Sequence, residues 1–128
     1  MFKEFTLIDS AMRQAFDRGS RSVMSLPFKK EFYKEIEGKS ISSEELVKRN
    51  DWERFVFAPF GINRAEEHFE WMIKLGILRR EVDGQGLTNR VKLTPLGKKI
   101  VDQWNGEIPR AGIRERIIEN FRRHKPRI

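Results

Sequence analysis

The sequence predicts a mainly α-helical domain with one small β-hairpin, an α+β fold. Three observations lead to this prediction: apolar residues recur at helical spacing in most segments, capping residues separate those segments, and the stretch 77–93 has a glycine-rich turn followed by a strand in which Val91 and Leu93 alternate with polar residues. A chain of 128 residues is long enough for one domain with its own core. We therefore expect an N-terminal helix and connector over residues 1–24, a central domain over 25–106, and a basic amphipathic helix over 107–128.

The first three helices are predicted from apolar spacing and from residues that cap helices. Apolar residues on one face predict a helix over residues 5–18, and Gly19 would end it. A second helix is expected over residues 27–38, because it opens with a proline and closes with a glycine. Ser42 and Glu45 form the Ser-x-x-Glu capping pattern, so a third helix starts there after a brief extended piece.

The second half of the central domain should contain the hairpin. Residues 52–60 are too apolar for a plain connector, so we expect a short helical turn and a loop that folds back on the core. Asn63 is a candidate cap for a further helix that ends near Gly76. Two strands and a glycine-rich turn follow over residues 77–93, and Thr94 with the proline after it opens the next helix.

This order of elements resembles the winged helix-turn-helix family of bacterial regulators, of the MarR and PadR kind. The likeness is carried by "SISSEELV", "AEEHFEWMIKLGILRR" and "RVKLTPLGKKIV", and it covers about residues 27–105. The most specific motif is Leu-Thr-Pro-Leu-Gly directly after the hairpin. The resemblance implies a winged helix-turn-helix with extra N- and C-terminal helices, and a transcriptional regulator that binds double-stranded DNA. The helix over residues 63–76 would enter the major groove, and the hairpin, or wing, would touch phosphate or the minor groove.

Carried onto this chain, the resemblance implies a set of DNA-binding side chains on that helix and on the wing. They are Arg64, His68, Trp71, Lys74, Arg79, Arg90 and Lys92. The sequence departs from the expected pattern because the helix carries two basic and three acidic side chains over residues 64–74. The alternative is a protein-interaction module, in which the acidic helix and the aromatic loop bind a protein partner.

Charge distribution gives an independent hint of an anionic partner. The formal net charge is +7, and residues 107–128 hold seven basic against three acidic side chains. A basic surface attracts nucleic acid by releasing condensed counterions, although a solvated basic face is an equally good interpretation of any single residue.

The resemblance implies a homodimer, in which an apolar stripe of the C-terminal segment pairs with its counterpart and the N-terminal helix could join it. The expected dimerisation residues are Phe5, Ile8, Met12, Ile113, Ile117 and Phe121. The stripe could instead cover the core of a monomer, and attachment to a membrane surface is the least favoured use.

Several classes of function find no support in the sequence. The absence of cysteine removes thiolate metal sites and cysteine nucleophiles, and the two histidines have no companion at metal-ligand spacing. We therefore expect no enzyme, metal or cofactor. No apolar run approaches the roughly 20 residues that cross a bilayer, and the first residues lack the apolar core of a secretory signal, so the expected compartment is the cytoplasm.

Overall fold

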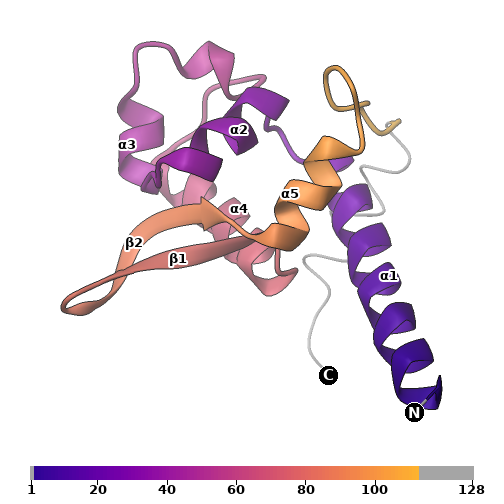
Figure 1. Ribbon diagram of the computed structural model, residues 1–128. Helices are drawn as coiled ribbons and strands as arrows, with labels where there is room; N and C mark the ends of the chain where they lie inside the picture. Colours follow the sequence, from indigo (N-terminus) through magenta and orange to yellow (C-terminus); the bar gives the residue numbers. More distant parts are fainter. Residues whose placement is uncertain (1, 113–128) are drawn as a thin grey trace, which may run out of the picture.

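The computed structural model of the chain describes residues 2–112, with side chains from residue 9 onward. In that range the protein is an α+β fold of five α-helices, one 3₁₀ helix and a two-stranded antiparallel hairpin. The elements in chain order are α1 (Phe2–Ser25), α2 (Lys30–Gly38), α3 (Ser43–Lys48), η1 (Trp52–Arg54), α4 (Ile62–Lys74), β1 (Leu78–Asp83), β2 (Gly86–Leu93) and α5 (Pro95–Asp102). The hairpin projects from one side of the helices, and α1 lies on the other side with its N-terminal half extending away from them (Figure 1).

Helix α1 is longer than the sequence predicts. It was expected to end near Arg18 with Gly19 as its cap, but it continues to Ser25. Gly19 lies where α1 packs on α5, and a Cβ atom there would stand 2.5 Å from Cδ1 of Ile100. The glycine therefore serves close helix packing, and the prediction of a cap is wrong.

The start of α2 also differs from its prediction. Pro27 does not open the helix, because the chain is extended at Phe28, which forms an isolated β-bridge with Val56. The amide of Phe57 donates to the carbonyl of Pro27 at 3.0 Å. This pairing holds the aromatic segment against the core, where Phe55 and Val56 are buried. The expected short helical turn and folded-back loop are confirmed.

Two predicted caps are confirmed and one is wrong. The hydroxyl of Ser42 accepts from the amide of Glu45 at 3.1 Å, and that of Thr94 accepts from the amide of Gly97 at 3.0 Å. Asn63 does not cap α4, because the helix begins at Ile62 and Gly61 occupies the cap position. Glycine has no side chain to form a capping hydrogen bond.

Aromatic rings from three segments form the centre of the core. The Phe28 and Phe32 rings stack with centroids 4.4 Å apart, and Phe69 of α4 lies 5.9 Å from Phe32. Burying one such side chain contributes about 1.5–3 kcal/mol. The cluster thus joins α2 and α4 and supports the surface from which the hairpin projects.

The hairpin is fastened to the helical part through its return strand. Ile41, between α2 and α3, forms a β-bridge with Val91 of β2, with N–O distances of 3.2 and 2.8 Å. Helix α5 closes the other end, because the carbonyl of Ile77 accepts from the amide of Thr94 at 3.0 Å. The base of the hairpin is therefore held on both sides.

Candidate functional site

The outer face of the hairpin carries two basic side chains directly opposite each other. Arg79 of β1 pairs in register with Lys92 of β2, while their neighbours Leu78 and Val91 are buried on the inner face. Neither Arg79 nor Lys92 forms an ion pair within the described part of the chain. The Cβ atoms of such a pair lie about 5 Å apart, and like charges there destabilise the sheet. An anionic partner would relieve that repulsion.

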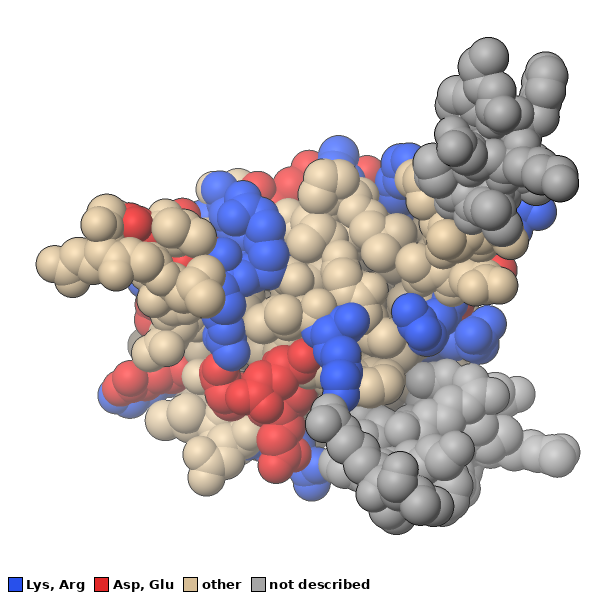
Figure 2. Space-filling view, turned by 90° about the horizontal axis from the view of Figure 1, so that it is seen from below, with Lys and Arg blue, Asp and Glu red and all other residues tan. Residues whose placement is uncertain are grey.

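The surrounding face contains both signs of charge. Figure 2 shows a band of Lys and Arg side chains that crosses the hairpin near its base, and an acidic patch beside it in the region of α4. Next to the polar turn at the tip, Val82 and Leu87 pair across the strands and are 62% and 77% exposed. The face thus offers cations at the base of the hairpin and one exposed apolar pair near its end.

Two further arginines of the hairpin are occupied by contacts with the helices. Arg90 donates to the carbonyl of Ser40 at 2.9 Å and forms an ion pair with Glu45 of α3. Arg80 forms an ion pair with Glu66 of α4, and its side chain is only 18% exposed. These arginines position the hairpin relative to α3 and α4. Arg90, which the sequence places among the DNA contacts, has its guanidinium engaged within the fold.

The exposed face of α4 differs from the one expected. His68 is 6% exposed, with the rings of Phe28 and Phe60 at 5.6 and 5.5 Å. Trp71 packs against the core and its indole nitrogen donates to the hydroxyl of Ser22 at 3.3 Å. The expectation that both side chains face outward is wrong, because α1 and the aromatic loop cover more of the helix than a single apolar stripe implies.

The remaining predicted residues of α4 do face solvent. Arg64 and Lys74 are exposed near the two ends of the helix, and Arg64 lies 3.6 Å from Glu67 in a weak ion pair. Glu67 and Glu70 are exposed between them. The middle of the helix therefore presents carboxylates, while the first turn carries no acidic residue.

Most of the predicted dimerisation residues cannot be placed. Ile113, Ile117 and Phe121 lie outside the described residues, as do the side chains of Phe5 and Ile8. Met12 is 54% exposed on the part of α1 that extends away from the domain.

Comparison with protein families places the chain in one of them. The model of the Npun_F0494-like family matches residues 10–123, which is most of its length. The chain belongs to this family. A search of curated proteins and a search of solved structures each found no match. The description of the Npun_F0494-like family names no activity, so the function of this member has to be argued from its geometry.

Two further properties of this Npun_F0494-like chain bear on its chemistry. None of the described helices is long and apolar enough to cross a membrane. Among the described side chains, no group of three histidines or carboxylates is placed to hold a metal ion.

Proposed function

We propose that this chain is a winged-helix protein that binds double-stranded DNA through its hairpin and acts as a transcriptional regulator. The order of elements supports the fold: α2, the Ile41 bridge, α3, α4, the hairpin and α5 follow one another as in the winged helix-turn-helix proteins that the sequence resembles. In such proteins the helix before the wing approaches the major groove.

The observation that carries the proposal is the cross-strand pair of Arg79 and Lys92. These are two like charges that face each other without a carboxylate partner in the described residues, an arrangement that costs stability in the free protein. Phosphates of a duplex would neutralise both and release counterions. Lys74, exposed at the end of α4 just before β1, is a third cation that we include in the proposed contact.

The first turn of α4 is the part best suited to the bases. In helix-turn-helix proteins the N-terminal residues of the recognition helix meet the base edges. Here Ile62, Asn63 and Arg64 are all exposed, and the carboxylates Glu67 and Glu70 follow one and two turns later. A tilted helix that enters the groove by its first turn keeps those carboxylates away from the phosphates.

The experiment is a titration of a fluorescently labelled mixed-sequence duplex, followed by anisotropy at 50 and 200 mM salt. We expect weak binding, with a Kd of about 10⁻⁴–10⁻⁶ M at the higher salt and tighter binding at the lower. A duplex that does not bind at 50 mM salt would remove the DNA-binding proposal.

A homodimer is part of this proposal, because two hairpins on one duplex would bind a two-fold site. The exposed Met12 on the outlying half of α1 supports it. Sedimentation of the full chain at micromolar concentration, beside a Met12→Glu variant, tests it. A wild-type chain that sediments as a monomer contradicts the dimer.

One observation favours a second function, a protein-interaction module. The exposed apolar pair Val82 and Leu87 at the hairpin tip is unusual for a surface that only meets phosphate, and the carboxylates of α4 suit a protein partner. The duplex titration distinguishes the two functions. A DNA-binding protein must bind the duplex in a salt-dependent way, whereas a protein-interaction module should not.

A further inference from the structure

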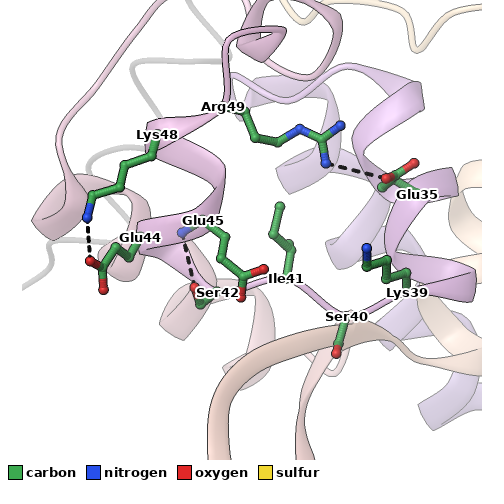
Figure 3. A pocket seen from close by; sticks show the side chains of 9 residues that line it. All are labelled: Glu35, Lys39, Ser40, Ile41, Ser42, Glu44, Glu45, Lys48 and Arg49. Carbon is green, nitrogen blue, oxygen red and sulfur yellow. Dashed lines mark hydrogen bonds and ion pairs between the residues drawn. The ribbon is translucent and has the colours of Figure 1, made fainter.

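A pocket separates α2 from α3 on the side of the domain that carries the Ile41 bridge. It has a volume of about 520 Å³, within the roughly 300–1,000 Å³ typical of small-molecule sites. Its lining residues are Glu35, Lys39, Ser40, Ile41, Ser42, Glu44, Glu45, Lys48 and Arg49. Figure 3 shows Lys39 and Ile41, from the connector between α2 and α3, and Arg49, directly after α3, around the same opening.

Each of the three carboxylates in the lining already has a cation. Glu44 pairs with Lys48 at 2.6 Å, Glu35 with Arg49 at 3.4 Å, and Glu45 with Arg90 of the hairpin. The hydrogen bond from Lys48 lowers the pKa of Glu44, which keeps that carboxylate ionised and paired. A cationic ligand would have to displace one of these partners.

Lys39 is the lining cation without a carboxylate partner among the described residues. Its side chain is exposed, and it lies beside Ile41, an apolar residue that is 5% exposed. The hydroxyls of Ser40 and Ser42 are already engaged, by Glu81 and by the amide of Glu45. The pocket therefore offers one uncompensated positive charge and a small apolar surface. That combination matches a single carboxylate on a short apolar body.

We infer that this pocket binds small organic monocarboxylates, with Lys39 holding the carboxylate and Ile41 contacting the apolar body, and that occupancy is transmitted to the hairpin. The second half of this inference rests on the proposed DNA-binding function, and the first half does not. Arg49 is held in place beside the ligand by Asp51, whose carboxylate accepts two hydrogen bonds from it, at 2.7 and 2.9 Å.

Transmission follows from the bonds that the lining residues make to β2. Ile41 is bridged to Val91, and Glu45 forms an ion pair with Arg90. Ser40 accepts from Arg90 at 3.1 Å and donates to Glu81 of β1. A ligand that shifts Ser40, Ile41 or Glu45 must shift the hairpin, and binding at the two sites is then coupled in both directions.

The binding test is an NMR titration of the full ¹⁵N-labelled chain with sodium benzoate and sodium hexanoate at constant ionic strength. Benzamide and benzylamine serve as neutral and cationic probes of similar shape to benzoate. We expect saturable shifts of the amides of residues 39–49 with the carboxylates and none with the other two. Lys39→Gln should weaken carboxylate binding by about tenfold or more, since it removes a charged hydrogen-bond donor. Lys99→Gln, another exposed lysine without an ion pair in the described chain, should leave it unchanged.

Three results would overturn the binding site: no saturable shift with either carboxylate, equal binding of benzylamine, or full binding by Lys39→Gln. The coupling is tested by repeating the duplex titration with and without saturating benzoate, sodium concentration held equal. We expect the duplex Kd to change by about fivefold or more in the wild type and to stay constant in Lys39→Gln.

The two proposals fail in different ways. Benzoate that binds through Lys39 without changing duplex affinity retains the site and removes the transmission. A duplex that never binds removes the proposed function and the transmission, while the benzoate titration still decides the site.

Discussion

Neutralising the two facing cations of the hairpin should remove most of the salt dependence of DNA binding. If Arg79, Lys92 and Lys74 each neutralise one phosphate, the logarithm of the association constant falls with the logarithm of salt concentration at a slope of about −2.7. Binding should then weaken about 40-fold between 50 and 200 mM salt. In the double variant Arg79→Gln/Lys92→Gln only Lys74 remains, and the same change in salt should weaken binding about 3.5-fold. Anisotropy of a labelled duplex at four salt concentrations measures both slopes.

A matched control distinguishes the effect of the two hairpin cations on DNA binding from the effect of the chain's overall positive charge. Arg18→Gln/Lys99→Gln also removes one arginine and one lysine, both exposed and without ion pairs in the described residues, but from α1 and α5. Its slope should stay near that of the wild type. The hairpin variant should also keep or gain stability, because it ends a like-charge cross-strand repulsion worth about 0.2–1 kcal/mol. Equal slopes for the two variants, or a hairpin variant that binds like the wild type, would refute the phosphate contact.

Three further predictions concern stability. Gly97→Ala should destabilise the fold by about 1–3 kcal/mol in chemical denaturation, because its Cβ would lie 2.4 Å from the carbonyl oxygen of Ile77, whereas Gly38→Ala, with nothing within 4 Å, should cause no such loss. Thr94→Ala should cost about 1 kcal/mol through loss of the α5 cap, and Thr94→Ser should restore most of it; equal stabilities of the two variants would contradict the capping role. Hydrogen bonds from Lys34 and Lys98 lower the pKa of Asp102 to about 2. The ionised Asp102 therefore stabilises the fold above the ordinary aspartate pKa of about 4, and this stabilisation is lost as pH falls toward 2. Acid unfolding of Asp102→Asn should accordingly be less steep than that of the wild type between pH 4 and 2, most clearly at low salt, and curves that superimpose would show that this ion pair does not contribute.

Features that depend on neighbours in the chain could be predicted from the sequence. The caps at Ser42 and Thr94 involve amides three residues away, and the hairpin alternates along its own strands. Arg79 and Lys92 were named from the resemblance to winged-helix proteins, and their cross-strand pairing came only with the structure. Local hydrogen bonds and periodicity are sufficient for such elements.

Features that depend on distant segments could not be predicted. Gly19 reads as a helix end until α5 is known to pack against it. His68 reads as a surface residue until the aromatic loop is known to cover it. Arg90 reads as a free cation until Glu45, 45 positions earlier, is placed beside it. The pocket with Lys39 needs α2 and α3 in position, and no motif in the sequence marks it.

The hydroxyl of Thr94 has a consequence for the order in which the chain folds. It donates to the carbonyl of Ile77, only 17 positions away, and so closes the hairpin and the start of α5 into one short loop. The contact between Arg90 and Ser40 spans 50 positions and has to close a longer loop. The hairpin and α5 should therefore form early, and the Ile41 bridge should close later. In that sequence of events, the surface that carries the cations is complete before the pocket beside it exists.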